Sequence, residues 1–341
     1  MREAFSFDDV LLVPQYSDIL SRSEVDISAT MSEGQVNVKF RLPVISAPMD
    51  TVTETSMALA IGREGGLGII HRYNSIEDQA NLILKAKDQG SFVGAAIGIT
   101  GDYLERAAEL KSSHVDVLCV DVAHGHHASA RYALETLRST FGDSISIMAG
   151  NVATLQAFND LADWGAHSIR VGIGGGSICS TRIQTGHGIP TFQSVVDCGR
   201  SDRGAALIAD GGIRTSGDMV KALAAGADFV MVGSLLAGTD EAPGEVMTVL
   251  GGEPRKVYRG MASREAQNEW RGRVSSIEGV SHTVPYKGPV AEVLNEMAVG
   301  IRSGLSYSGA RSIQELQAKA RFIRQTSAGA IESSTHIKRR K

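Results

Sequence analysis

The stretch Ser168-Ile-Arg-Val-Gly-Ile-Gly-Gly-Gly-Ser-Ile-Cys-Ser-Thr-Arg182 joins a short apolar run to a glycine-rich loop. The run is typical of a parallel strand that is buried on both faces. The glycines permit positive φ angles and a close backbone approach, which a cradle of N–H groups around a phosphate requires. Cys179 lies in the same loop, where backbone dipoles and Arg182 would stabilise a thiolate. The stretch predicts a strand that brings an anion cradle and a nucleophile together, with a flexible turn and an incidental buried cysteine as the alternative.

Similar apolar runs recur along the chain and are separated by segments with helix composition. The segments 75–89, 103–111, 128–140 and 154–164 each begin at or near a Ser, Thr, Asn or Asp that can cap a helix. Gly165 and Gly226 follow two such segments, as glycines after a helix C-terminus do. The predicted strands are residues 43–46, 67–70, 92–97, 117–121, 144–148, 168–171, 206–209 and 229–232.

Eight strands that alternate with helices predict a (β/α)8 barrel, and a doubly wound open sheet is the alternative. The polar residues favour the barrel because they follow the strands, and the carboxyl ends of barrel strands meet at one rim. An open sheet would scatter them along an edge. These residues are Met49-Asp50, His71-Arg72, Asp121, Gly150-Asn151, the Cys179 loop, Asp210-Gly-Gly212 and Gly233-Ser234.

The remaining segments predict one domain over residues 1–341 with an excursion near its end. Residues 253–289 are charged and lack clear strand alternation, so we expect a lid or flap over the rim. Residues 290–302 and 312–323 have helical patterns, and residues 325–341 form a polar C-terminal tail.

Bulk properties exclude several classes of protein. A net charge of −4 over 341 residues argues against a nucleic-acid binder, and no apolar run is long enough to span a membrane. The three cysteines, Cys119, Cys179 and Cys198, show no metal-ligand spacing and cannot all pair. With no signal-peptide pattern at the N-terminus, we expect a cytoplasmic protein.

Two further rim loops have the composition of phosphate cradles. Gly211-Gly212 and Gly233-Ser234 follow the last two strands, where barrels frequently bind phosphate. Asp210 precedes the first loop and could accept hydrogen bonds from a ribose diol, or alternatively cap a helix. A phosphate, a ribose and a nearby thiolate together suggest a mononucleotide attacked by Cys179.

The chain resembles the family of inosine 5′-monophosphate (IMP) dehydrogenase and GMP reductase. The matching segments occur in family order and cover nearly the whole chain, and the family fold is a (β/α)8 barrel, usually tetrameric. They are Phe7-Asp-Asp-Val-Leu-Leu-Val-Pro14, Ile45-Ser-Ala-Pro-Met-Asp-Thr-Val-Thr53, Gly65-Gly-Leu-Gly-Ile-Ile-His71, Gly150-Asn-Val-Ala-Thr154, Gly174-Gly-Gly-Ser-Ile-Cys-Ser-Thr-Arg182, Ile208-Ala-Asp-Gly-Gly-Ile213, Val257-Tyr-Arg-Gly-Met261 and Val284-Pro-Tyr-Lys-Gly288.

The resemblance implies a role for each matching residue. It makes Cys179 the nucleophile that attacks C2 of the purine, with Thr181 and Glu278 in proton transfer to or from the leaving group. A nicotinamide cofactor would bind beside Asp121, Asn151 and Arg170. The carbonyls of Gly174, Gly176 and Cys179 match a potassium site of family dehydrogenases. The implied substrate-binding residues are Met49 and Met261 at the base, Asp210 at the ribose, Ser177, Gly212, Gly233, Ser234 and Tyr258 at the phosphate, and Gly260.

Two departures from the family dehydrogenases indicate the reaction. Residues 87–93 run directly from helix to strand, so the regulatory CBS modules that many dehydrogenases insert there are missing. Between Met261 and Glu278 the chain has no adjacent Arg-Tyr pair, which dehydrogenases of this family use to activate water. Arg271 and Arg273 lie in that segment and are interpreted equally well as solvated charges.

We therefore expect a GMP reductase, a homotetramer that converts GMP to IMP and ammonia with NADPH. A compact IMP dehydrogenase that uses NAD is the main alternative, because residues 46–54 and 122–126 look more like those of dehydrogenases. A catalytically silent purine-nucleotide sensor is a third possibility, although Cys179, Thr181 and Glu278 argue against it.

Overall fold

Eight parallel strands close into a barrel, as the sequence predicts. The computed structural model describes residues 2–33, 36–248, 252–272 and 277–333. Neighbouring strands pair in chain order, and the last, β11, pairs with the first, β4, through Val230–Val44 and Val232–Ser46. The strands are β4 (Val44–Ser46), β5 (Leu67–Ile70), β6 (Val93–Ile97), β7 (Val117–Asp121), β8 (Ser146–Val152), β9 (Ser168–Val171), β10 (Ala206–Asp210) and β11 (Phe229–Val232).

Helices surround the barrel, and several of them begin at a capping side chain that the sequence offers, although Asp102 makes no capping hydrogen bond at the start of α3. The Thr154 side chain accepts the amide of Ala157 at the start of α5, and Thr215 does the same for Asp218 at the start of α8. Gly165 and Gly226 follow α5 and α8 with φ of +109° and +116°, so the predicted C-terminal glycines are confirmed. The surrounding helices are α1 (Thr55–Arg63), α2 (Ile76–Lys87), α3 (Tyr103–Ser112), α4 (Ala128–Phe141), α5 (Leu155–Asp163), α7 (Thr191–Cys198), α8 (Ser216–Ala224) and α10 (Val290–Tyr307).

Burial explains why the barrel strands are so uniformly apolar. Every residue of β5, β6, β9 and β11 is buried, because the barrel interior covers one face and the helices cover the other. The fifth strand was predicted two residues early. It begins at Ser146 and continues through Gly150 to Val152, because Gly150 pairs with Asp121 and Val152 with Val171.

The chain ends form small sheets that the sequence analysis missed. Near the N-terminus, β1 (Val10–Leu12) follows a short 3-10 helix, η1 (Phe7–Asp9), and β2 (Ala29–Glu33) pairs with β3 (Val36–Phe40) after η2 (Arg22–Glu24). The helix predicted over 312–323 ends early: α11 is Ile313–Lys319, and β15 (Phe322–Arg324) pairs antiparallel with β1. The predicted polar tail contains α12 (Ser327–Glu332), and residues 334–341 lie outside the described ranges.

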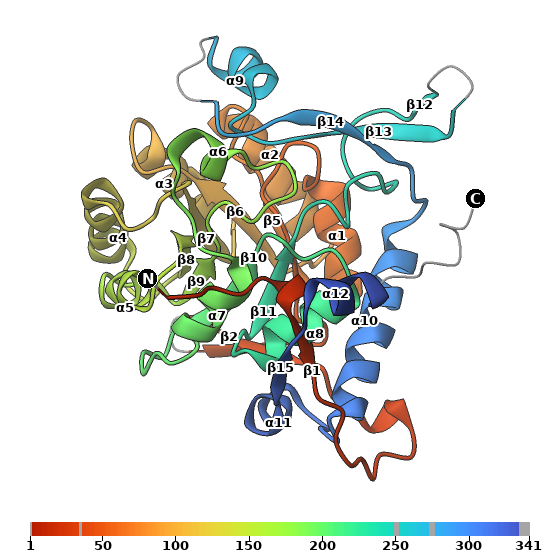
Figure 1. Ribbon diagram of the computed structural model, residues 1–341. Coiled ribbons are helices and arrows are strands. Elements are labelled where there is room, and N and C mark those ends of the chain that lie inside the picture. The colour runs from red at the N-terminus through yellow and green to blue at the C-terminus, as the bar shows by residue number, and fades with distance from the viewer. Residues whose placement is uncertain (1, 34–35, 249–251, 273–276, 334–341) are drawn as a thin grey trace.

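The excursion near residues 253–289 is more regular than predicted. It contains β13 (Pro254–Arg259), α9 (Arg264–Arg271) and β14 (Ser281–Pro285), and β13 pairs antiparallel with β14 and with β12 (Met247–Thr248). Figure 1 shows β13, β14 and α9 across one end of the barrel, far from β1 and β15. Arg273, one of the two arginines noted between Met261 and Glu278, lies outside the described residues.

No helix within the described ranges combines the length and the apolar character needed to cross a bilayer.

Candidate active site

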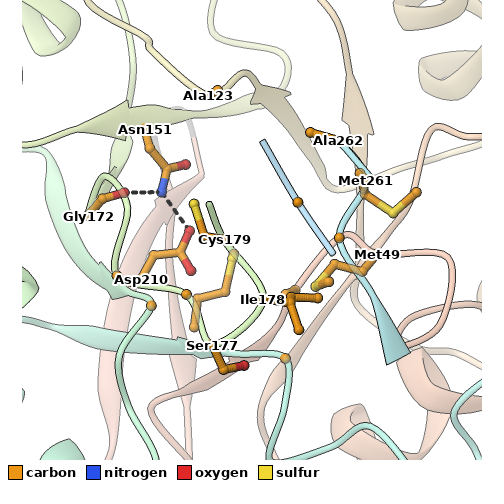
Figure 2. Close-up of a pocket in the computed structure, with 18 of the residues that line it drawn as sticks. Met49, Ala123, Asn151, Gly172, Ser177, Ile178, Cys179, Asp210, Met261 and Ala262 are labelled. Atoms are coloured by element: carbon orange, nitrogen blue, oxygen red, sulfur yellow. Dashed lines mark hydrogen bonds between the residues drawn. The ribbon is translucent and has the colours of Figure 1, made fainter. Parts of the chain in front are cut away.

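A cavity of about 290 Å³ opens where the carboxyl ends of the barrel strands meet the excursion. Most of the residues that the sequence places on the rim line it, so their predicted convergence is confirmed, whereas Asp50, His71 and Gly150 do not belong to the lining. Figure 2 shows Asn151 and Asp210 on one side, Met49 and Met261 on the other, and Cys179 between them. The predicted site residues in the lining are Met49, Asp121, Asn151, Arg170, Gly174, Gly176, Ser177, Cys179, Thr181, Asp210, Gly212, Gly233, Ser234, Tyr258, Gly260, Met261 and Glu278.

Cys179 begins a chain of hydrogen bonds that ends on a carboxylate. Its Sγ donates to Thr181 Oγ1 at 3.2 Å, and Thr181 Oγ1 donates to Glu278 Oε2 at 2.8 Å. Backbone pairing aligns the two segments, because the amide of Ser180 donates to the Glu278 carbonyl at 2.8 Å and the amide of Val280 donates to the Ile178 carbonyl at 3.0 Å. The chain can carry the thiol proton to Glu278 and leave a thiolate in the cavity.

The other two cysteines are placed differently. Cys119 and Cys198 are both fully buried, and burial raises the pKa of each thiol to about 12. Each therefore stays protonated at neutral pH, whereas Cys179 is half-buried in the wall of the cavity. The position of Cys179 identifies it as the candidate nucleophile.

Glycine-rich turns form one end of the cavity. Gly212 has φ of +78°, a conformation that favours glycine, and a Cβ at Gly233 would lie 3.0 Å from Tyr258 Oη and 3.1 Å from Met49 Sδ. Burial raises the pKa of Tyr258 to about 12, and a hydrogen bond with Ser177 partly offsets this. The phenol stays protonated at neutral pH and can donate to an anion beside Ser177, Gly212, Gly233 and Ser234.

Asp210 lies in a buried network of charges below the cavity. Its Oδ2 accepts from Asn151 Nδ2 at 2.8 Å and from Arg170 Nη2 at 2.9 Å, and Arg170 Nη1 donates to Asp121 Oδ1 at 2.5 Å. Burial favours loss of the Arg170 proton, but the carboxylates of Asp210 and Asp121 hold its pKa above the ordinary value. The helix cap considered for Asp210 was wrong, since Thr215 caps α8.

Arg170 and Asp210 have different roles in this network. Arg170 is only 6% exposed and spans two carboxylates, so it orients Asp121 and Asp210 from below. All the hydrogen bonds described for the Asp210 carboxylate end on Oδ2, which leaves Oδ1 available to a ribose hydroxyl.

We predict that Arg170→Gln lowers the free energy of unfolding by about 3–5 kcal/mol, because two buried carboxylates lose their counter-ion. Urea denaturation measures the loss. The matched control is Arg131→Gln, which loses an exposed ion pair with Glu135 and a guanidinium contact 5.9 Å above the Trp164 ring, and which should cost about 1 kcal/mol or less. Equal losses in both variants would contradict a structural role for Arg170.

Two methionines and residues of the excursion form the side of the cavity opposite Asp210. The amide of Asp50 lies 3.3 Å from Met261 Sδ, and Asp50 Oδ2 accepts from Arg259 Nε at 2.9 Å. Trp270 Nε1 donates to the same oxygen at 3.1 Å, which attaches α9 to the barrel. Through these contacts of Asp50, the segment that contains Met49 and the excursion that contains Met261 form one wall of the cavity.

Sequence reasoning left two groups of site residues without a role. Asp50 and Trp270 are 220 positions apart in the chain, and no local pattern pairs them. Arg72 was placed on the rim but given no role, and Tyr73 was not singled out. Both line the cavity beside Asp121, where Arg72 Nη2 donates to the Asp121 carbonyl at 3.2 Å. The signal available for Arg72 was its position directly after a strand.

The carbonyls predicted to hold potassium lie on the Cys179 loop. The Gly176 carbonyl accepts the Cys179 amide at 3.1 Å, and its second lone pair is still available to a cation. Potassium binding therefore stays a prediction. In the described part of the chain, no three His, Cys, Asp or Glu side chains gather as ligands for a metal ion.

Comparison with known proteins agrees with this geometry. The IMP dehydrogenase / GMP reductase domain model matches residues 4–336. The chain is 36% identical to an inosine-5′-monophosphate dehydrogenase of Nitrosopumilus maritimus, over 98% of each chain. It is 32% identical to a GMP reductase of Leishmania major, over 98% of this chain and 97% of the relative. A structure of Trypanosoma brucei GMP reductase in complex with guanosine 5′-monophosphate superposes with a TM-score of 0.92, at 32% identity over 98% of each chain.

Proposed function

The chain belongs to the IMP dehydrogenase / GMP reductase family of oxidoreductases that act on purine mononucleotides, and on this premise we propose that it is a GMP reductase. The observation that carries the proposal is the hydrogen-bond chain Cys179–Thr181–Glu278 on the cavity wall. It supplies a nucleophile and a proton donor, the two groups that removal of an amine from a purine needs. The lid sequence supports the same direction, since residues 262–277 contain no Arg-Tyr pair.

The proposed reaction proceeds in two steps on Cys179. In the first, the thiol proton passes through Thr181 to Glu278, and the thiolate adds to C2 of GMP. Protonated Glu278 then donates to the exocyclic nitrogen, the C2–N bond breaks and ammonia leaves. In the second, C2 accepts a hydride, the C2–S bond breaks and IMP forms. Overall, GMP, NADPH and two protons give IMP, NADP⁺ and an ammonium ion.

The mononucleotide would lie across the cavity with its phosphate at the glycine-rich end. Ser177, Gly212, Gly233, Ser234 and Tyr258 would hold the phosphate through backbone amides and hydroxyl groups. Asp210 would accept the ribose hydroxyls. Met49 and Met261 would contact the base, since they lie on the side opposite Asp210. Gly260 directly precedes Met261 in the lining and would contact the base with it.

The nicotinamide cofactor, when bound, supplies the hydride. Asp121, Asn151 and Arg72 would hold it, with Arg170 orienting Asp121 from below. The charge of Arg72 supports this assignment: its Nε is buried, makes no hydrogen bond in the described part of the chain and lies 3.8 Å from Asp121 Oδ2, so the guanidinium sits beside the Asp121 carboxylate at the cavity. A guanidinium beside a cavity is suited to a phosphate group of a dinucleotide.

We predict that Arg72→Gln raises the KM for NADPH by about tenfold or more, because a charge-assisted hydrogen bond is lost. The Kd for GMP should change less than about twofold, since Arg72 lies on the side away from the phosphate cradle. Steady-state kinetics and a GMP titration measure the two values. A parallel loss of GMP affinity would contradict the assignment.

The proposed assembly is a homotetramer. Tyr16 and Leu20 are large apolar side chains that are 91% and 96% exposed, as residues that pack against another subunit are in an isolated chain. Sedimentation equilibrium tests this directly, and a monomer at micromolar concentration would contradict it.

Two assays run side by side test the proposed activity. GMP with NADPH should consume NADPH and release ammonia in equal amounts. IMP oxidation by NAD is the second candidate, because residues 46–54 and 122–126 look like those of dehydrogenases. Sustained formation of NADH from IMP would favour it, whereas a single burst of about one NADH per site would show an adduct without hydrolysis. A silent sensor would bind nucleotide without turnover.

A further inference from the structure

A second hollow, of about 200 Å³, lies against the phosphate end of the cavity. The two share Gly175, Ser177, Gly212, Ile213 and Ser234, so residues that would bind the 5′-phosphate border both hollows. The remaining wall of the second hollow comes from the N-terminal segment, the residues around the start of α7 and two arginines. These residues are Ser6, Phe7, Asp8, Arg182, Pro190, Thr191 and Arg214.

A buried hydroxyl in this hollow has no partner. Thr191 is 4% exposed, and its Oγ1 makes no hydrogen bond within the described residues. A Cβ built at Gly212 would lie 3.7 Å from this oxygen, which places the hydroxyl beside the phosphate cradle. A buried hydroxyl without a partner is unfavourable, so a ligand oxygen that pairs with it is stabilised.

The charges of the hollow favour an anion. Its lining holds two arginines, Arg182 and Arg214, against one carboxylate, Asp8. Arg182 Nη2 already donates to the carbonyls of Ile173 and Ile189, so Arg214 is the arginine that a ligand would contact. Arg214 pairs with Asp8, but their side chains are 56% and 60% exposed, so the pair is weak. Arg214 Nε also lies 3.9 Å from Asp218 Oδ2. An anion with two negative charges can therefore replace Asp8 as the ion-pair partner of Arg214. Thr191 also begins α7, whose amino end adds a partial positive charge.

We propose that this hollow binds the second phosphate of a purine nucleoside 5′-diphosphate whose base and ribose occupy the main cavity. The inference rests on the proposed function, because it uses the same mononucleotide site. The first phosphate stays in the cradle, and the second extends between the residues that border both hollows, toward Thr191 and Arg214. Such a nucleotide competes with the mononucleotide for the active site.

Calorimetric titration with guanosine 5′-diphosphate (GDP) and GMP, without the dinucleotide cofactor, tests the inference. GDP should displace GMP with a Kd within about tenfold of that of GMP. Arg214→Gln should raise the Kd for GDP by about tenfold or more and the Kd for GMP by less than about twofold, since only the diphosphate loses a charge-assisted hydrogen bond. Arg200→Gln removes an exposed arginine that does not line the hollow and should change neither.

A second variant keeps the test independent of Arg214. Thr191→Val preserves the shape of the side chain, removes the hydroxyl and should weaken GDP alone, with GMP binding as the check of folding. Failure of GDP to displace GMP, or equal losses for both nucleotides in Arg214→Gln, would overturn the inference and leave the proposed function intact. If GMP itself does not bind, both the inference and the proposed function are contradicted.

Discussion

Cys179→Ala is expected to abolish turnover while mononucleotide binding survives. Without the sulfur no covalent adduct can form at C2, and loss of a nucleophile costs at least about 1,000-fold in rate. The Kd for GMP should change by less than about threefold, because the phosphate cradle and Asp210 are untouched. Stopped assays of NADPH consumption and a GMP titration on the same preparation measure both quantities.

The matched control is Ser180→Ala, on the same loop. Ser180 Oγ is buried and has no hydrogen-bond partner among the described residues, so its removal breaks no bond of the site. We expect this variant to keep its activity within about threefold. Turnover by Cys179→Ala at a tenth of the wild-type rate would show that the reaction does not pass through the Cys179 adduct.

Glu278→Gln is expected to lower the rate of GMP deamination by about 100- to 10,000-fold. A glutamine can accept the Thr181 hydrogen bond but cannot take the thiol proton or give it to the departing nitrogen. The loss should therefore fall on kcat, with the GMP Kd nearly unchanged. Ammonia release under saturating GMP and NADPH measures it.

Two companion variants separate proton transfer from lid folding. Glu265→Gln changes an exposed carboxylate on α9 in the same excursion and should leave kcat within about twofold. Thr181→Val breaks the chain at its middle and should approach the Glu278→Gln rate, whereas Thr181→Ser keeps the hydroxyl and should restore activity. Equal activity of Thr181→Val and Thr181→Ser would exclude the relay.

The barrel could be predicted from sequence because the signals for its strands and helices lie within short segments of the chain. Each strand is a short apolar run buried on both faces, and several helices begin at a capping side chain of their own, as Thr154 and Thr215 illustrate. The errors occur where pairing partners are distant. The β15 strand forms because Phe322 pairs with Leu12, more than 300 positions earlier, so helical periodicity over 312–323 was misleading.

The site residues were predicted or missed for the same reason. Cys179 and the glycine turns were found because nucleophile and cradle share one loop, and Thr181 and Glu278 through the family resemblance. Contacts between distant residues left no local pattern: Arg170 beneath Asp210, Trp270 on Asp50, and Thr191 behind Gly212. The lid was predicted as irregular because its strands β13 and β14 pair with each other rather than with the barrel, and their alternation is weak.

The most direct test of the central claim is the stoichiometry of wild-type protein with GMP and NADPH. If Cys179 and Glu278 act as proposed, one ammonium ion and one IMP form for each NADPH consumed, over many turnovers. Multiple turnovers of IMP to XMP with NAD, together with no ammonia from GMP, would contradict the account and identify a dehydrogenase.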